Sequence, residues 1–146
     1  MEPESAAVQL ECTLAIIKPD AVERGLTGVI IKRIEDERFT IMGMRLVHLT
    51  KREAEGFYAV HRARPFFGAL TDFMSSGPAV VLALQGESAI SRWRQLMGAT
   101  NPTEAEPDTL RRLYGSSIDR NATHGSDAPE TAAFEVGYFF AGSEFI

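Results

Sequence analysis

The chain has 146 residues, 45% hydrophobic and 24% charged, which is typical of a single globular domain spanning residues 1–146. Its net charge of −5 argues against general nucleic-acid binding, which normally needs a basic surface. The single cysteine excludes an intrachain disulfide, and no apolar run is long enough to cross a bilayer.

The start of the chain, MEPESAAVQLE, is acidic and rich in small residues. It has neither the basic start and apolar run of a signal peptide nor the arginine and serine bias of a transit peptide. We therefore expect a cytoplasmic protein with no membrane partner, and we expect residues 1–10 to fray.

The first elements alternate between strand and helix patterns. The apolar, β-branched run CTLAIIK predicts a buried strand that ends at Lys18, before Pro19. Apolar residues at helical spacing in GVIIKRIEDERF predict an amphipathic helix. The segment TIMGMRLVHLT alternates well enough to predict a second strand.

The middle of the chain predicts a helical insert and then a third strand. TKREAEGFYAVH opens with a capping box formed by Thr50 and Glu53, and RPFFGALTDFMSSGP predicts a short helix closed by Gly77. The apolar run PAVVLALQG predicts a strand, and ESAISRWRQLM predicts a helix of mixed character.

The last third of the chain is less regular. GATNPTEAEPDT has two prolines and no periodicity, so it predicts a loop, and LRRLYG predicts a helical turn. GSSIDRNATHGSD is irregular with one short strand. APETAAFEVGYFF predicts a helix with Asp127 as its N-cap and Pro129 in its first turn.

This order of elements predicts an α+β fold. Two βαβ-like halves fit a ferredoxin-like βαββαβ sandwich with a four-stranded antiparallel sheet and helices on one face. The helical hairpin and the long loop are additions to that plan.

The familiar nucleotide-binding motifs are missing. There is no P-loop, no dinucleotide-binding glycine motif and no nucleophile elbow, and the three histidines are too scattered for a sequence-evident zinc site. Arginines do gather in the last third of the chain: Arg92, Arg94, Arg111, Arg112 and Arg120. Such a group could bind a small phosphorylated ligand or form a solvated, ion-paired face.

His124 lies in RNATHGSD, among small and polar residues just before a predicted helix. A histidine that only packs would normally have apolar neighbours, so His124 is a candidate nucleophile. A neutral imidazole suits phosphoryl transfer, in which catalysis consists mainly of positioning and charge neutralisation.

Glu135 falls on the same helical stripe as Ala128, Ala132 and Phe139, where packing would favour an apolar residue. A buried carboxylate needs a partner, and His124 is a candidate because a carboxylate on one ring nitrogen leaves the other free to attack. Alternatively, Glu135 lies at the edge of the stripe and reaches water.

Four stretches resemble the motifs of nucleoside diphosphate kinases, in that family's order and spacing: IIKPDAVERGL, HRARPFFGALTDFMSSGP, MGATNPTEAEPDTLR and RNATHGSD. The resemblance runs from about Thr13 to Phe140. It implies reversible transfer of the terminal phosphoryl group from a nucleoside triphosphate, mainly ATP, to a nucleoside diphosphate. The implied mechanism is ping-pong, through a phosphohistidine on His124.

The resemblance also implies roles for individual residues. Glu135 would hold and polarise the His124 ring together with Ser126, and Tyr58 would pack near it. Lys18 would act in both catalysis and nucleotide binding. The other implied nucleotide contacts are Phe66 stacked on the base, Leu70 beside it, and Arg94, Thr100, Arg111 and Asn121 on phosphates or sugar. Mg²⁺ would be held mainly by the phosphates, with Asp127 touching it through water.

Some of these residues have plainer interpretations. Lys18 could be solvated at a strand end, and Tyr58 could be a core tyrosine with a wet hydroxyl. Phe66 and Phe67 could both be core residues; we expect Phe67 in the core and Phe66 exposed in a cleft. We expect His48 and His61 to be non-catalytic.

The main alternative function is a weakly active or non-catalytic nucleotide-binding regulatory member of the same fold. The intact motifs argue against it. Asp119 stands where many family members have glycine, a departure within the long loop region. The short ending FFAGSEFI resembles bacterial members, which implies a homo-oligomer, with a tetramer favoured over a hexamer.

Overall fold

The computed structural model describes residues 10–145. The expected fraying of residues 1–10 lies outside the described residues except at Leu10, where the first strand, β1 (Leu10–Ile17), begins. No helix within this range is long and apolar enough to span a bilayer.

A sheet with the strand order β2-β3-β1-β4 forms the centre of the described chain. β1 lies between β3 (Ala79–Glu87) and β4 (Thr123–Gly125), and β2 (Thr40–Val47) forms an edge beyond β3. Every neighbouring pair is antiparallel. The α+β, ferredoxin-like sandwich expected from the sequence is therefore confirmed.

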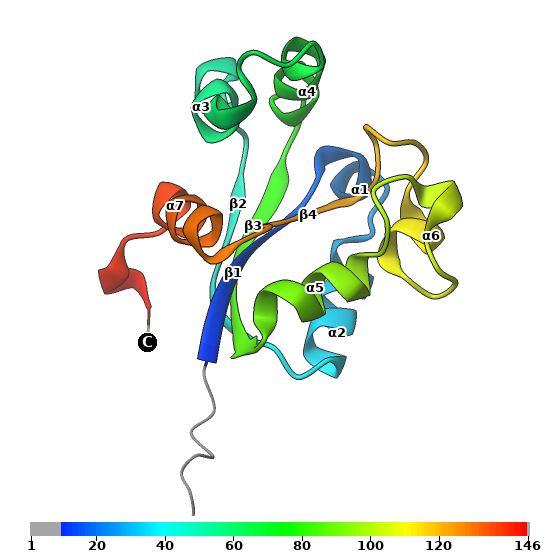
Figure 1. Cartoon of the computed structure of the whole chain (residues 1–146), viewed down its shortest axis with the longest axis vertical. Coiled ribbons are helices and arrows are strands. Elements are labelled where there is room, and N and C mark those ends of the chain that lie inside the picture. The colour runs from blue at the N-terminus through cyan, green and yellow to red at the C-terminus, as the bar shows by residue number, and fades with distance from the viewer. Residues whose placement is uncertain (1–9, 146) are drawn as a thin grey trace, which may run out of the picture.

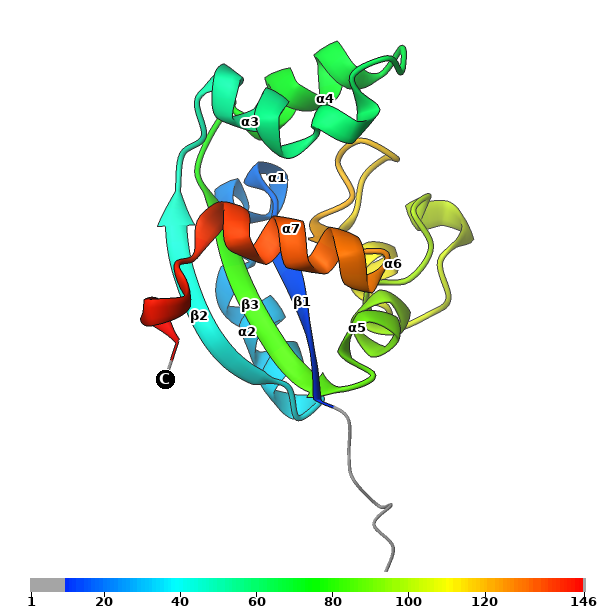
Figure 2. The same cartoon turned by 60° about the vertical axis from the view of Figure 1, so that its left-hand side comes forward.

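Helices cover both faces of the sheet, so the expectation of helices on one face was wrong (Figures 1 and 2). Ala15 and Ile17 of β1 point into one core, under α2 (Thr27–Asp36) and α5 (Ala89–Met97). Leu14 and Ile16 point into the other. The helices over this second core are α3 (Lys51–Phe57), α4 (Phe67–Met74) and α7 (Pro129–Phe139).

The short elements complete the description. The sequence patterns missed α1 (Pro19–Glu23), a helix of five residues that starts directly after Lys18. The expected helical turn is α6 (Leu110–Tyr114). Short 3₁₀ turns occur at Ala59–His61, Pro102–Glu104 and Gly142–Glu144.

One of the two expected helix caps is present. Thr50 Oγ1 accepts a hydrogen bond from the Glu53 amide at 3.0 Å, and Glu53 Oε1 accepts from the Thr50 amide at 2.9 Å, so the capping box is confirmed. Asp127 as the N-cap of α7 was wrong, because Ala128 is the N-cap. The Thr131 hydroxyl caps the start of the helix instead. Its Oγ1 accepts from the Ala128 amide at 3.0 Å and donates to Asp127 Oδ1 at 2.7 Å.

Candidate active site

His124 lies on β4, the edge strand next to β1. Its backbone pairs with Ile16 of β1, and its carbonyl oxygen accepts a hydrogen bond of 3.0 Å from the buried indole of Trp93. The imidazole lies edge-on to the rings of Phe57 and Tyr58, with centroids 5.4 and 6.0 Å away. The ring is therefore fixed by both backbone pairing and packing, although its side chain stays 17% exposed.

Glu135 on α7 is the partner of His124. Its Oε1 lies 2.9 Å from His124 Nε2 and accepts a second hydrogen bond from Ser126 Oγ at 2.8 Å. Ser126 Oγ in turn accepts from the Leu14 amide of β1 at 3.1 Å. The Glu135 side chain is only 13% exposed, so the alternative in which it simply reaches water does not hold. A carboxylate on Nε2 leaves the lone pair on Nδ1 for attack.

A second polar group lies where β1 ends. Lys18 Nζ donates to Asn121 Oδ1 at 2.8 Å, and Asn121 Nδ2 donates to the Thr100 carbonyl at 3.0 Å. The Ala122 carbonyl accepts from the Lys18 amide at 2.8 Å, and the Ala122 amide donates to Asp20 Oδ2 at 3.1 Å. These bonds hold Ala122 at a φ of +75°, a conformation that costs a non-glycine residue about 1–2 kcal/mol.

Buried positive charge is concentrated beside this group. The pKa of Lys18 is lowered to about 8, mainly by burial and to a smaller extent by the positive charge of Arg111. Burial, followed by Arg94, lowers the pKa of Arg111 to about 10. Arg111 donates only to the carbonyls of Gly98 and Thr123, and neither Lys18 nor Arg111 forms an ion pair among the described residues. An anion placed here would relieve the repulsion between these cations.

One cavity of about 490 Å³ brings the candidate residues together. Every site residue expected from the sequence lines it except Ser126, which bonds Glu135 from behind. Phe66 is 45% exposed, as expected for a cleft residue, and Phe67 is partly buried against the core. The Tyr58 hydroxyl is buried without a hydrogen-bond partner among the described residues, and this burial raises its pKa.

The cavity also contains residues to which the sequence assigned no site role: Phe57, Val60, His61, Ile118, Asp119, Gly125 and Thr131. Ile118 is 56% and Val60 is 81% exposed, so both add apolar surface to the cavity. Ile118 lies in an irregular segment, where neither helical nor strand periodicity could indicate its direction. His61 lines the cavity too, but it has no carboxylate partner among the described residues.

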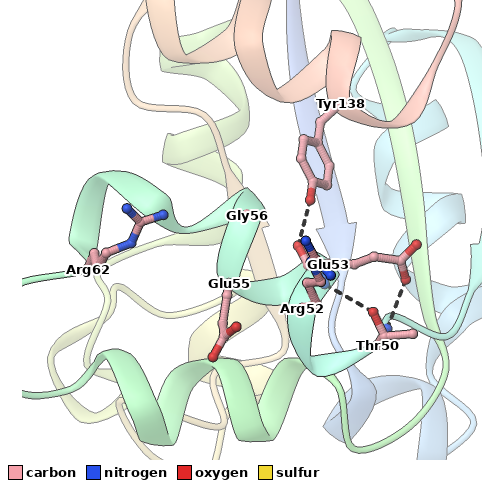
Figure 3. A pocket seen from close by; sticks show the side chains of 7 residues that line it. All are labelled: Thr50, Arg52, Glu53, Glu55, Gly56, Arg62 and Tyr138. Carbon is pink, nitrogen blue, oxygen red and sulfur yellow. Dashed lines mark hydrogen bonds between the residues drawn. The ribbon is translucent and has the colours of Figure 1, made fainter.

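A second hollow of about 520 Å³ lies beside α3, is also lined by Tyr138 of α7, and contains none of the expected site residues (Figure 3). Thr50 and Glu53 satisfy each other there, and the Tyr138 hydroxyl donates to the Glu53 carbonyl at 2.8 Å. The side chains of Glu55 and Arg62 do not point toward a common centre (Figure 3). The hollow therefore lacks the convergent polar groups of the His124 cavity.

Within residues 10–145, no group of three His, Cys, Asp or Glu side chains lies close enough together to hold a metal ion. Asp127 nevertheless lines the His124 cavity, and Thr131 fixes one of its oxygens. Mg²⁺ in nucleotide sites is typically held by one or two carboxylates together with substrate phosphates. The donors around this cavity fit that mode of binding.

Comparisons with known proteins point to one family. The family model described as nucleoside diphosphate kinase matches residues 11–145. The chain is 61% identical over 135 residues to a nucleoside diphosphate kinase of Desulfovibrio desulfuricans, covering 92% of this chain and 97% of that protein. It is 60% identical over 137 residues to one of Pelobacter propionicus, covering 94% and 100%.

Two solved structures are similar in fold. The Aquifex aeolicus nucleoside diphosphate kinase superposes with a TM-score of 0.93 at 43% identity, covering 94% of this chain and all of that chain. A halophilic nucleoside diphosphate kinase from Halobacterium salinarum, in complex with CDP, superposes with a TM-score of 0.90 at 36% identity, covering 94% and 92%.

The fold and the matched family model define a phosphotransferase that acts on nucleotides. The chain belongs to the nucleoside diphosphate kinase family. The family and enzyme class implied by the sequence motifs are confirmed, and the non-catalytic alternative is not favoured.

Proposed function

We propose that His124 carries the phosphoryl group between nucleotides. Nδ1 attacks the terminal phosphorus of a nucleoside triphosphate, with ATP as the main donor. A nitrogen–phosphorus bond forms while the bond to the bridging oxygen breaks, and the nucleoside diphosphate leaves. A second diphosphate then takes the phosphoryl group by the reverse step. The observation that supports this most strongly is the His124–Glu135–Ser126 hydrogen-bond chain at the wall of the cavity.

Glu135 and Ser126 act on the ring of His124. The carboxylate holds the proton on Nε2, keeps the ring in one orientation and stabilises the positive charge that develops on it as Nδ1 is phosphorylated. Tyr58 limits the rotation of the ring by packing against it edge-on.

The cationic side of the cavity receives the phosphates. Lys18, Arg94 and Arg111 neutralise charge that spreads over the phosphoryl oxygens in the transition state. Asn121 is held by Lys18 and by the Thr100 carbonyl, which directs these polar groups to phosphate and sugar oxygens. Mg²⁺, when bound with the nucleotide, would supply further charge neutralisation, and Asp127 would contact it through water.

The apolar side of the cavity receives the base. Phe66 presents an exposed ring, and Leu70 and Ile118 line the same cavity. Stacking on an aromatic face is tolerant of base identity because every base has a π-face. Purine and pyrimidine nucleotides should therefore both serve as donors and acceptors.

We also propose that the chain forms a homo-oligomer, with a tetramer favoured over a hexamer. The edge strand β2 supports self-association, because Met44 is 52% and Leu46 is 69% exposed beside unpaired backbone groups. Light scattering of the protein and of Leu46→Lys tests this proposal: a monomeric parent protein would contradict it. A cytoplasmic location, where nucleotides are abundant, remains part of the proposal and is tested by cell fractionation.

The variant His124→Gln tests the role of the nucleophile. We expect loss of transfer from ATP to GDP, with nucleotide binding and the free energy of unfolding retained. The matched control is His48→Gln, which changes a histidine outside this cavity, bonded to the Ser75 carbonyl, and should keep full turnover. Retained turnover in His124→Gln would rule out the phosphohistidine mechanism.

A further inference from the structure

The segment 115–121, which leads into β4, folds back on itself between Ser116 and Arg120. The Ser116 amide donates to the Arg120 carbonyl at 2.7 Å, and the Arg120 amide donates to Ser117 Oγ at 3.0 Å. Ile118 and Asp119, inside this small turn, line the nucleotide cavity. The turn is therefore a wall of the cavity whose shape is set by its own backbone.

Both ends of this wall are anchored, and the Gly115 amide donates to the Arg111 carbonyl at 2.8 Å. Asn121 is bonded to Lys18 and to Thr100, so the end next to β4 is tied to β1 and to the long loop. Among the described residues, no hydrogen bond or ion pair joins segment 115–121 to α4, the helix that carries Leu70 on the opposite wall. The turn and α4 nevertheless approach each other in both views (Figures 1 and 2).

The Arg120 side chain crosses this gap. Its guanidinium carbon lies 4.9 Å from the centre of the Phe73 ring on α4, within the range of a cation–π contact. Phe73 itself packs partly buried against the core beneath α4. The contact therefore links the wall containing Ile118 and Asp119 to the helix that follows Phe66 and contains Leu70.

We propose that Arg120 is a positioning residue for nucleotide binding, which it supports by holding segment 115–121 against Phe73 and so setting the width of the cavity. This inference rests on the proposed function of the cavity. Arg120 does not line the cavity itself, so its effect passes through the two walls and not through contact with the nucleotide.

The proposal separates two kinds of ligand. A nucleotide spans the cavity from His124 to Phe66 and should be sensitive to the spacing of the walls. Phosphoramidate, a small phosphoryl donor with neither base nor sugar, needs only His124 and the cationic groups. Loosening the contact between Arg120 and Phe73 should weaken nucleotide binding and leave phosphorylation by phosphoramidate unchanged.

The experiment compares the full-length protein with Arg120→Met, Arg120→Lys, Phe73→Leu and the double variant Arg120→Met/Phe73→Leu. Phe73→Leu keeps an apolar side chain and removes the π-face. The matched control is Arg92→Met, because the Arg92 guanidinium carbon lies 4.5 Å from the Phe39 ring, away from the His124 cavity. KM and kcat are measured for ADP and GDP, alongside the rate of His124 phosphorylation by phosphoramidate.

We expect Arg120→Met and Phe73→Leu each to raise KM for both nucleotides by about two- to fivefold, with kcat nearly unchanged. The double variant should be no worse than the single ones, since both remove the same contact. Arg120→Lys should retain part of the effect of the cation, and Arg92→Met should leave KM unchanged.

Three results would overturn the inference. They are an unchanged KM in Arg120→Met, a rise in KM in the double variant equal to the product of the single rises, or an equally large loss in the rate of phosphorylation by phosphoramidate. Failure of the wider function looks different. In that case the parent protein itself would not become phosphorylated on His124 by either donor.

Discussion

Replacing Glu135 by glutamine perturbs the site with little change in shape. Glu135 Oε1 accepts from two donors, His124 Nε2 at 2.9 Å and Ser126 Oγ at 2.8 Å. Glutamine has one amide oxygen and no charge, so the variant weakens the hold on the imidazole and the stabilisation of its developing positive charge.

The size of the effect follows from these bonds. A hydrogen bond to a charged group contributes about 1.5–3 kcal/mol, and glutamine keeps part of the geometry. A loss of about 2 kcal/mol from the transition state slows phosphorylation of His124 about 30-fold. KM for ATP should change little, because Glu135 bonds His124 and Ser126 and belongs to neither the cationic nor the apolar part of the cavity.

Rapid-quench measurement of the first half-reaction, with ATP and no acceptor, gives this rate directly. Glu130→Gln is the matched control, since Glu130 is exposed on the same helix and should leave the rate unchanged. An unchanged rate in Glu135→Gln would mean that Glu135 only packs. An equal loss in Glu130→Gln would trace the effect to the helix instead.

Three further predictions concern binding, pH and stability. Phe66→Ala should raise KM about fivefold for purine and pyrimidine nucleotides alike; a loss confined to purines in steady-state assays would contradict simple stacking. The pKa of Lys18 lies near 8, so kcat/KM should fall as pH rises through about 8 and the ammonium loses its charge, and a pH profile of Lys18→Met should lack this limb. Because that pKa is below the ordinary 10.5, the unfolded chain holds more protons between these values, and this group makes the free energy of unfolding rise with pH there. Gly125→Ala would place a Cβ 2.5 Å from the Trp93 ring and should cost about 1–3 kcal/mol in urea unfolding, whereas Gly137→Ala, whose Cβ meets no described atom within 4 Å, should not destabilise; equal effects would refute the packing argument.

The fold was largely predictable because its strands and helices follow simple periodic patterns. The placement of helices on both faces could also have been inferred. β1 ends in a run of five buried residues and β3 begins with six, and such continuous apolar strands are typical of a sheet covered on both sides. The N-cap of α7 could not be predicted from residue preferences, because it is Ala128, whose side chain has no acceptor, and the Thr131 hydroxyl accepts from its amide instead.

Site residues within long motifs could be predicted from the sequence. The directions in which their side chains point were harder to predict. The stripe containing Glu135 indicated that a carboxylate would need a partner, but only the packing of α7 over β1 brings it to His124. Ile118 and Arg120 lie in an irregular turn whose backbone bonds are local. No periodicity indicates that one of these side chains faces the cavity and the other reaches Phe73.

A phosphohistidine on His124 can be detected by labelling the protein. The protein is mixed with Mg²⁺ and ATP labelled in its γ-phosphate, without acceptor, and GDP is then added. We predict acid-labile, alkali-stable label on the parent protein, absent from His124→Gln, that moves to GTP when GDP arrives. Transfer from ATP to GDP with no labelled protein at any time, or equal labelling of His124→Gln, would show that His124 does not carry the phosphoryl group.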